Sequence, residues 1–577
     1  MNTKVKYISV LAVVALGATT AGRAQSAMDA YTLSQTQLRG TARFLSMGGA
    51  FGALGGDLST LNQNPAGIGV YRGSEIGATL DIDFQRSTLQ NTGNPQGDFT
   101  NTQTRAACNN FGYVGSVALS SSVMPYFQWG VTYNRINSFE RAYRGYFPTL
   151  DTSWTNYVAS VSGGNAAADL WGNDDYDPFF QSDVPWISAL AFNSYLISEN
   201  PGYNSNEDYP QYLGLYQNGS EANADIQVRE KGYIDEYSIN FGGNFANMVY
   251  WGLGFGITDL SFSRWSYYSE QVSGALVPSE VDPSTQQPLG HTTGAAEWGI
   301  ENYQQMSGTG FNVKFGLIFK PINELRLGLA VHTPTWYALN FSQSAWTDYD
   351  LWWIDRYTVD GQHYADEVHT SNYSGQPYST DNPYAATGDG YFSRHMKTPW
   401  RLMASAAGVI GGRFILSADY VYEAYPSMTF SNDYGEMTEV TNDIKQYYQP
   451  SHELRLGAEF RVTPRFSLRA GYNYKSTGAK QTARDGMDYV YTTGTQTLYT
   501  FDGDRQNVSC GLGYRFGGFY IDAAYIHSTQ TNTWSAFTAF PRSANAEYAL
   551  DGSAVGGPRA KLRDTRNHLV LTLGYKF

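Results

Sequence analysis

The last ten residues of the chain alternate between large apolar side chains and smaller or polar ones. The apolar set is Leu569, Leu571, Leu573, Tyr575 and Phe577. A period of two puts neighbouring side chains on opposite faces of a β-strand, so the segment predicts a strand with one apolar face. In water, such a face beside an unpaired backbone edge would promote aggregation. In a closed barrel both edges are paired and the apolar face meets lipid, which favours a barrel strand.

Fourteen segments of the chain show strand-like alternation. We predict strands at about 74–86, 110–121, 125–140, 230–244, 248–264, 307–320, 324–340, 397–410, 412–428, 448–462, 465–476, 506–516, 518–530 and 564–577. In the first of them, Asp81 and Asp83 alternate with Leu80 and Ile82. Because carboxylates do not face lipid, the aspartate face is predicted to line the lumen.

The connections between these strands alternate strictly between short and long. The six short ones lie near 121–124, 245–248, 321–323, 410–412, 463–464 and 516–518. The seven long ones span about 87–109, 141–229, 265–306, 341–396, 429–447, 477–505 and 531–563. Short periplasmic turns and long external loops produce this rhythm in even-stranded barrels. We therefore predict an all-β fold, a 14-stranded antiparallel transmembrane β-barrel with long extracellular loops and both termini on the periplasmic side.

Residues 41–72 differ in composition from the strands. Seven glycines fall between Gly48 and Gly69, and apolar residues lie among and before them. These apolar residues are Phe44, Leu45, Phe51, Leu54, Leu58 and Leu61. Glycines permit tight turns and close backbone approach, and the apolar residues argue against the alternative of a flexible linker. We predict short packed helices that form an N-terminal hatch, a plug at the periplasmic mouth able to fold upward into the lumen.

The beginning of the chain is typical of a secretory signal peptide. Lys4 and Lys6 precede an apolar run at 8–18 and the small residues Gly22 and Ala24. The predicted division is a signal peptide at 1–24, an N-terminal extension and hatch at 25–73, and the barrel at 74–577. After the signal peptide no run of 18 apolar residues occurs, and the mean hydropathy is −0.39, which excludes an α-helical membrane protein.

The composition favours the same class of protein. The chain has 45 Tyr, 60 Gly and 30 Phe, and only 16% of its residues are charged, as aromatic girdles and an uncrowded polar lumen require. The net charge of −14 argues against a nucleic-acid partner. We expect a monomer in the outer membrane of a Gram-negative cell, with the lipid bilayer as its surroundings. We interpret Leu573, Tyr575 and Phe577 as the signal for the barrel-assembly machinery.

One segment and several strand pairs resemble a known family. The segment from Gly49 to Gly69, which ends in Asn64-Pro65-Ala66-Gly67, resembles the hatch of the FadL family of outer-membrane long-chain fatty-acid and hydrocarbon channels. Residues 310–321, 398–402 with 419–422, and 454–460 with 468–472 resemble strands of that family as it occurs in Bacteroidetes-type bacteria. The family fold is a fourteen-stranded barrel plugged by the hatch, which agrees with the strand count above.

The resemblance also implies a mechanism. In the family a hydrophobic ligand lands in an apolar groove among the external loops, moves to a site near the hatch and leaves sideways into the membrane. The opening comes from an inward kink of the third strand, held open by the hatch triplet. Here the triplet is Asn64, Pro65 and Ala66, followed by Gly67, and Gly130 is the expected bend of the third strand. Lateral exit suits a greasy molecule, because it never crosses water.

Other candidate sites are less specific. His363 and His369 flank Asp366 and Glu367 in a loop and could ligate a metal or haem, but the absence of a spacing motif favours solvated loop residues. Residues 173–177 contain three aspartates that could hold Ca²⁺, without the full run of ligands. The two cysteines, Cys108 and Cys510, could form one disulfide.

The sequence favours a transport function. No nucleophile–base pair or phosphate-binding loop stands out, so we predict no enzyme, no cofactor and no metal. The leading hypothesis is a channel for small hydrophobic ligands such as long-chain fatty acids, gated by the hatch and discharging laterally. No counterpart of the basic residues that would hold a fatty-acid carboxylate is evident. The alternative is a scaffold or receptor whose long aromatic loops bind haemin or a protein. A hydrolase is a third hypothesis.

Overall fold

The computed structural model describes residues 26–91, 98–172, 176–180, 184–203, 210–281, 288–353, 356–359, 362–365, 392–432, 435–492, 494–543 and 550–577. The segment predicted as a signal peptide lies outside these residues and stays a prediction.

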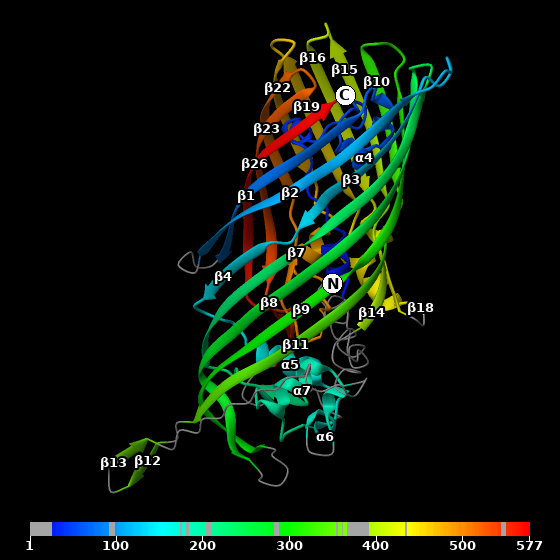
Figure 1. The fold of residues 1–577 in the computed structure, drawn as a ribbon. Helices are drawn as coiled ribbons and strands as arrows, with labels where there is room; N and C mark the ends of the chain where they lie inside the picture. The colour runs from blue at the N-terminus through cyan, green and yellow to red at the C-terminus, as the bar shows by residue number, and fades with distance from the viewer. Residues whose placement is uncertain are drawn as a thin grey trace, which may run out of the picture.

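The wall of the molecule is a closed ring of fourteen antiparallel strands (Figure 1). In order around the ring they are β1 (Glu75–Asn91), β2 (Phe99–Ala118), β3 (Tyr126–Ser138) with β4 (Arg141–Phe147), β7 (Glu221–Phe245), β8 (Val249–Val281), β9 (Pro288–Phe319), β10 (Leu325–His332) with β11 (Trp336–Trp353), β14 (Phe392–Lys397) with β15 (Arg401–Ile410), β16 (Phe414–Glu423) with β17 (Thr429–Asn432), β19 (Ser451–Arg461), β20 (Phe466–Lys475), β22 (Arg505–Phe516), β23 (Phe519–Ser535) and β26 (Arg559–Lys576). The first and last strands close the ring, pairing from Glu75 opposite Lys576 to Asn91 opposite Ala560. The predicted barrel and its six short turns are confirmed.

Short elements lie inside the ring and at its extracellular end. Inside are α2 (Ala27–Ser34), α3 (Ala42–Ser46), α4 (Thr60–Gln63) and η1 (Pro65–Val70). The external connections hold α5 (Trp154–Ser162), α6 (Ala167–Leu170), η3 (Pro178–Phe180), α7 (Trp186–Asn193), η5 (Tyr425–Ser427), α8 (Thr438–Tyr447), α9 (Gln481–Arg484) and the short strands β5 (Ile197–Glu199), β6 (Tyr212–Gly214), β12 (Arg356–Val359), β13 (Gln362–Ala365), β18 (Gly435–Glu436), β21 (Tyr499–Phe501), β24 (Phe540–Ser543) and β25 (Leu550–Val555). None of the described helices is long and apolar enough to cross a bilayer.

The outer face of the wall carries an apolar belt. On β1, the side chains of Ile76 and Leu80 are 41% and 49% exposed, whereas Asp81, which points to the opposite face, is 1% exposed. The predicted lumenal position of the aspartate face is therefore confirmed. Aromatic residues follow the extracellular edge of the belt, namely Tyr237, Trp336, Trp400, Tyr420 and Tyr525. An apolar belt bordered by aromatic residues on a closed barrel is a lipid-facing surface.

Several wall strands extend far beyond the belt. β8 and β9 are paired from Val249 opposite Phe319 to Val281 opposite Pro288, so the loop predicted at 265–306 is wrong. The loops predicted at 87–109 and 341–396 are likewise shortened by β1, β2 and β11. Above Ile257 the outward residues of β8 are mostly polar, and it is the inward residues Leu260 and Phe262 that are apolar and buried, so the lipid-facing alternation stops although the backbone ladder continues. The ladder needs only paired N–H and C=O groups, which any residue but proline supplies.

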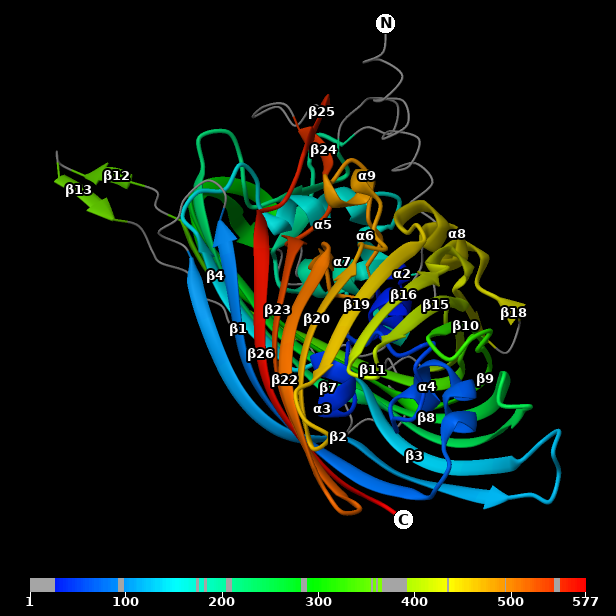
Figure 2. The ribbon, with the colours of Figure 1, turned by 90° about the horizontal axis from the view of Figure 1, so that it is seen from above.

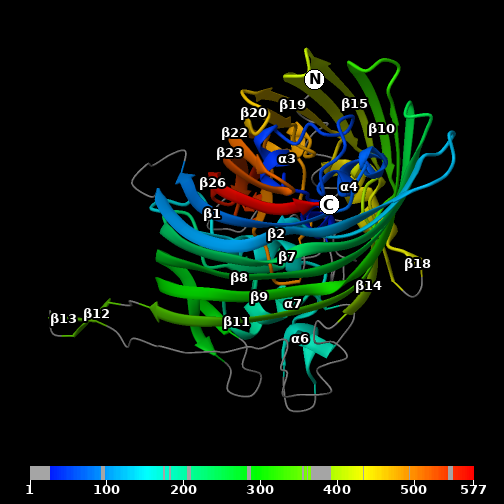
Figure 3. The ribbon, with the colours of Figure 1, turned by 45° about the horizontal axis from the view of Figure 1, so that its top comes forward.

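The hatch, residues 41–72, packs inside the ring at the end that carries the short turns (Figures 2 and 3). All six apolar residues named above for this segment are at most 5% exposed, so the linker alternative is wrong. Where the wall strands contact the backbone of the hatch, the wall residues are glycines. A methyl group on Gly252 would lie 2.2 Å from the carbonyl of Pro65, and one on Gly471 would lie 2.0 Å from the amide nitrogen of Gly48. Glycine is needed there because any side chain would occupy the space of the hatch.

The opposite end is covered by the cap, which we define as the described part of residues 148–220. It packs with the upper strands around one apolar core that includes Trp154, Trp298 and Trp534. Trp154 is 1% exposed, and its ring centroid lies 5.0 Å from that of Trp298. In Figure 1 helices α5, α6 and α7 gather at the end of the barrel away from the C-terminus.

A buried carboxylate fastens the first helix of the cap to the wall. The Glu270 side chain on β8 accepts hydrogen bonds from the Trp154 amide at 2.9 Å and the Tyr268 hydroxyl at 2.7 Å, and also from the Ser153 hydroxyl. Burial raises the pKa of Glu270 to about 7, because its charge is removed from water. This residue lies well beyond the belt, on the extracellular extension of β8.

Candidate functional site

The third strand of the wall is interrupted. β3 ends at Ser138 and β4 begins at Arg141. On the other side of the interruption, β2 pairs with β3 only over Asn110–Ala118. Its upper part, Phe99–Asn109, is paired with β1 alone, and β4 is paired with β7 alone. The described wall therefore has no hydrogen-bonded ladder between the upper part of β2 and β4, and we call this place the wall break.

Beyond the wall break the chain turns toward the lumen. The Phe147 ring of β4 stacks on Trp534 of β23 with centroids 5.5 Å apart. The Arg141 guanidinium lies 3.2 Å from a carboxylate oxygen of Asp564 on β26. Trp534 and Asp564 are buried on the lumenal side of their strands. Because β4 contacts these distant strands from within, it has left the cylinder on which β2 lies.

The N-terminal segment takes the place of the missing strand partner. Gln37 donates its backbone N–H to the Ile136 carbonyl and its side-chain amide to the Ser138 carbonyl, both at 3.0 Å. These carbonyls belong to the last three residues of β3, where its ladder with β2 has ended. Buried carbonyls require donors, so Gln37 satisfies groups that the wall break would leave unpaired.

An ion pair spans the wall break. Arg105 on β2 contacts the carboxylate of Glu140, which lies between β3 and β4. The Arg105 side chain is 53% exposed, while that of Glu140 is 11% exposed. The Glu140 carbonyl also accepts a hydrogen bond from Arg566 at 3.1 Å. Side chains, and not backbone ladders, thus hold the two sides of the break together.

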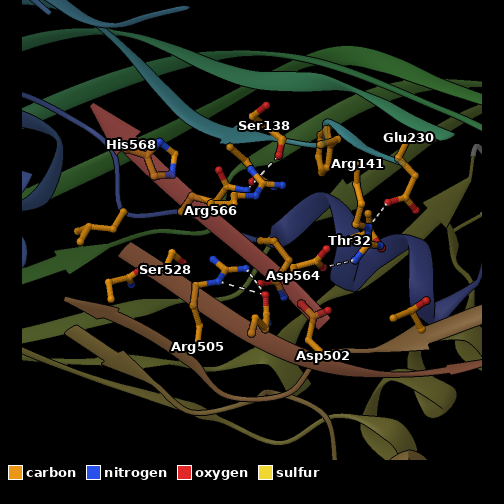
Figure 4. A pocket seen from close by; sticks show the side chains of 18 of the residues that line it. Thr32, Ser138, Arg141, Glu230, Asp502, Arg505, Ser528, Asp564, Arg566 and His568 are labelled. Carbon is orange, nitrogen blue, oxygen red and sulfur yellow. Dashed lines mark hydrogen bonds and ion pairs between the residues drawn. The ribbon is translucent and has the colours of Figure 1, made fainter. Parts of the chain in front are cut away.

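A cavity of about 120 Å³ adjoins the wall break on the lumenal side, and we call it the break cavity (Figure 4). Its lining joins the break, the N-terminal segment and the far wall: Asn137, Ser138, Phe139 and Arg141; Tyr31, Thr32, Gln35, Gln37 and Leu38; and Glu230, Arg264, Thr500, Asp502, Arg505, Asn507, Ile526, Ser528, Gln530, Asp564, Arg566 and His568. In Figure 4, Arg141 and Ser138 approach the cavity from one side and Arg505 and Asp502 from the other.

A second cavity of about 110 Å³ lies across the N-terminal segment from the first. Both cavities are lined by Gln35, Gln37 and Leu38. The segment from Ser26 to Gly40 therefore divides the free space of the lumen into two compartments. Its helix α2 is held by stacking of Tyr31 on Tyr448, with ring centroids 4.4 Å apart.

Most charges around the break cavity are paired. Glu230 is bonded by Arg141 at 2.7 Å and by Arg264 at 2.8 Å. Arg505 differs, because it bonds Gln530 and the Thr36 carbonyl and has no carboxylate within ion-pair distance among the described residues. The sequence showed no basic residue that could hold a fatty-acid carboxylate. Arg505 is a candidate of this kind, and it was missed because nothing in its local sequence distinguishes it from other lumenal arginines.

The predicted hatch tip is buried and internally bonded. Asn64 donates to the Gly52 carbonyl at 2.6 Å, and its side-chain oxygen accepts the Ala66 amide at 3.1 Å. Pro65 is the first residue of η1, where its missing N–H leaves no bond unmade. The Gly67 amide bonds the Asn64 carbonyl at 2.9 Å. The tip lies against β8 and β9, where Gly252 and Gly316 make room for it, and its role as a gate stays a prediction.

The predicted bend at Gly130 is not where the third strand is interrupted. Gly130 keeps regular register with both β2 and β7, and the first irregularity on β3 falls between Arg135 and Asn137. Gly130 instead faces the hatch, where an added methyl would lie 3.1 Å from Leu61. A second tie between hatch and third strand is the bond from the Gln128 side chain to the Tyr71 carbonyl, at 2.8 Å.

The predicted residues of the C-terminal strand and the two cysteines lie away from the lumen. Leu573 and Tyr575 are exposed on the outer face of β26, Phe577 is exposed directly after it, and the use of these residues by the assembly machinery stays a prediction. Cys108 and Cys510 are free and exposed. Residues 173–175, Asp366, Glu367 and His369, together with the His363 side chain, lie outside the described parts. Within the residues that the structure describes, no group of three or more His, Cys, Asp or Glu is placed to hold a metal.

The protein is an outer-membrane β-barrel. Apart from the wall break, the wall strands pair with their neighbours in a closed antiparallel ring, and the belt is apolar, which is the arrangement by which strands cross an outer membrane. No family model matches the sequence, and no curated protein matches it.

Solved structures of a FadL homologue and of toluene transporters are similar to the chain over nearly its whole length. One is a Pseudomonas aeruginosa FadL homologue, with 14% identity, a TM-score of 0.45, and coverage of 94% of this chain and 99% of that one. Another is the Pseudomonas putida toluene transporter TodX, with 12% identity, a TM-score of 0.41, and coverage of 94% and 100%. The Ralstonia pickettii toluene transporter TbuX has 12% identity, a TM-score of 0.38, and coverage of 95% and 100%. The barrel of the present chain is established by its own strand pairing.

Proposed function

We propose that the protein takes up small hydrophobic ligands across the outer membrane and releases them laterally through the wall break. The observation that carries this proposal is the position of the break cavity directly behind the unladdered part of the wall. This part includes the height of Phe84 on the neighbouring β1, an apolar residue of the outer face that lies opposite Thr104. Material leaving by this route would enter the bilayer and not water. Only an apolar molecule gains free energy by such a transfer, so the route selects hydrophobic cargo.

The closure of both barrel ends supports the proposal. The hatch packs against wall glycines at one end, and the cap packs around buried tryptophans at the other. Neither contact resembles a water-filled pore. A ligand that reaches the break cavity therefore has its shortest way out past Ser138 and Arg105.

The N-terminal segment is proposed as the gate, together with the hatch to which it leads. Gln37 binds the carbonyls of β3 at the break, and the segment around it separates the two cavities. Each cavity alone is small for a long-chain fatty acid. Withdrawal of the segment would join the two cavities and would also remove Gln37 from the carbonyls at the wall break. The movement that makes room for a ligand would therefore also open its way out.

The lining also bears on the head group of the ligand. Arg505 faces the break cavity and has no carboxylate within ion-pair distance among the described residues, although Asp502 lines the same cavity. A ligand with an apolar chain and an acidic head would supply one, through a charge-assisted hydrogen bond. A long-chain carboxylic acid therefore fits the lining better than a wholly apolar hydrocarbon.

The test is to obstruct the wall break. With Cys108 and Cys510 replaced by serine, Arg105→Cys would be reacted with a bulky maleimide and the uptake of a fluorescent long-chain fatty acid measured in outer-membrane vesicles. We expect uptake to fall several-fold after the reaction. The matched control is Arg86→Cys, an exposed position on the outer face of the neighbouring β1. Equal uptake by both reacted variants would refute lateral release.

A second function is favoured by one feature of the wall. β8 and β9 continue as a paired hairpin to Val281 and Pro288, far above the belt, and could present the extracellular end to a protein partner. Removing residues 270–298 would delete this arm together with Glu270 and Trp298, which fasten the cap. A scaffold would then lose its partner while the reconstituted barrel still carried fatty acid.

A further inference from the structure

One row of cross-strand neighbours runs over five strands on the outer wall. Ile257 of β8 lies opposite Phe311 of β9, and Phe311 lies opposite Trp336 of β11. Trp336 lies opposite Lys397 of β14, and Lys397 lies opposite Thr429 of β17. Opposed side chains on one face are about 5 Å apart. A continuous apolar surface of three large side chains therefore ends at a lysine.

This row marks the extracellular edge of the belt. The next outward row above it holds Asp259, Thr309, Ala338, His395 and Ser431. The change from Ile and Phe to Asp and Thr within one row is the change from hydrocarbon to the polar head-group region. On its own wall strand, Lys397 lies between the exposed Trp400 and Leu402 on the belt side and Ser393 on the extracellular side, so it lies at the depth at which lipid head groups meet the wall.

A groove is cut into the wall at this row. Pro334 and Pro399 interrupt two adjacent wall strands, between β10 and β11 and between β14 and β15. Proline supplies no ladder N–H, so the strands bend there. The resulting groove measures about 690 Å³ and is lined by Ile257, Thr309, Gly310, Phe311, Trp336, Tyr337, Ala338, His395, Met396, Lys397, Thr429 and Ser431.

The cation in the groove has no anionic partner in the described part of the chain. Lys397 makes no ion pair there, whereas lumenal lysines such as Lys475 are paired with carboxylates, in that case Glu423 at 2.7 Å. His395 lies beside Lys397 in the groove and adds two ring nitrogens. A half-buried ammonium beside apolar side chains is complementary to an anion that carries hydrocarbon.

We propose that this groove binds a phosphate-bearing lipid of the outer leaflet. The acyl chains lie along Ile257, Phe311 and Trp336, and the phosphate meets Lys397, with His395 as a second donor. The occupant comes from the bilayer that already surrounds the belt, so the site is separate from the lumenal route and independent of the proposed transport function.

The experiment titrates the full-length barrel in detergent with dioleoyl phosphatidic acid and follows binding by native mass spectrometry. A basic residue near an anionic lipid surface contributes roughly fivefold in affinity, so Lys397→Gln should weaken binding by about that factor. Lys397→Arg should bind like the unchanged protein. Lys561→Gln is the matched control, because Lys561 is exposed at the same end of the barrel on β26, away from the groove. Trp336→Ala tests the apolar part and should also weaken binding.

Three results would overturn the proposal. The lysine does not bind the lipid if Lys397→Gln keeps its affinity. That the variant is folded would be shown by a gel mobility that changes on heating, as for the unchanged barrel. Equal binding of dioleoylglycerol, which has the same chains without phosphate, would mean that no phosphate is recognised. Displacement of the lipid by an equal concentration of inorganic phosphate would assign the site to a free anion.

Discussion

The hatch and the cap both close the barrel, but they do so by different kinds of contact. The hatch lies against wall backbone, and the wall offers glycines such as Gly252 and Gly316 where the two meet. The cap is held by large side chains packed around Trp154 and Trp298, with Glu270 as its polar anchor. Backbone contact allows almost no change in either partner, while a side-chain core loses stability gradually as atoms are removed.

This difference separates what can move from what cannot. The hatch is specified by shape, so it stays in place or leaves as a unit. The cap is specified by a side-chain core that it shares with the upper strands, so it can loosen while the hatch stays in place. The N-terminal segment lies between them. Its helix α2 packs in an apolar cluster, whereas the stretch at Gln37 is held by polar bonds, which makes that stretch the part best able to move at low cost.

The largest effect is expected from filling a wall glycine. Gly252→Val would place side-chain atoms on the Pro65 carbonyl, so the hatch could not keep its position. We expect the barrel to form with the hatch displaced, giving a large rise in ion conductance in planar bilayers and protease cleavage within 41–72. Gly408→Val, whose added methyl would meet nothing closer than 3.9 Å, should conduct like the unchanged protein. A closed Gly252→Val channel would contradict the shape argument.

The second largest effect is expected from truncating a side chain in the core of the cap. Trp154→Ala removes a fully buried ring and its bond to Thr497, and should destabilise the cap by about 3–5 kcal/mol. Hydrogen exchange should quicken in α5 and α7 while the hatch stays protected. Trp171→Ala, at a partly buried ring on the same core, should cost clearly less. Loss of hatch protection in Trp154→Ala would show that cap and hatch are coupled after all.

The polar anchor of the cap should respond to pH. The pKa of Glu270 on β8 is about 7 while the cap covers it, against an ordinary value of 4.5, so between these pH values Glu270 holds a proton that it loses when the cap unfolds. Stability is then fully present below pH 4.5 and falls by about 3 kcal/mol as pH rises to 7. Glu270→Gln should abolish this fall, measured as cap unfolding by tryptophan fluorescence at pH 5 and pH 7.5. Exposed Glu297→Gln should leave it unchanged.

The smallest effect concerns the wall break. The Arg105–Glu140 pair is half-exposed, and such pairs contribute at most about 1 kcal/mol. Arg105→Gln should therefore raise the rate of fatty-acid release by no more than roughly fivefold, measured by stopped-flow transfer into lipid vesicles, since 1 kcal/mol corresponds to about that factor. Arg86→Gln is the control on the same side of the barrel. A fall in the release rate would mean that the pair guides the ligand and does not retain it.

Much of the architecture followed from local patterns. The period-two alternation identified all fourteen wall strands and the face of Asp81, because each strand must show lipid on one side and lumen on the other. Glycines among buried leucines distinguished the hatch from a linker. The strand ends beyond the membrane were missed, since their outward faces no longer carry the apolar residues that lipid requires. After Ile257 on β8, for example, the apolar residues Leu260 and Phe262 are buried on the inward face.

The sequence by itself determined that this chain closes into a lipid-facing barrel plugged by its own beginning, because hydrophobic period and glycine content are properties of neighbouring residues. Only the tertiary structure decided where the wall opens, which residue fills the opening and which lysine stands alone at the edge of the belt. Gln37 meets β3 across about a hundred residues, and Lys397 joins its row through four strand pairings. Such juxtapositions depend on register between distant segments, which no local pattern records.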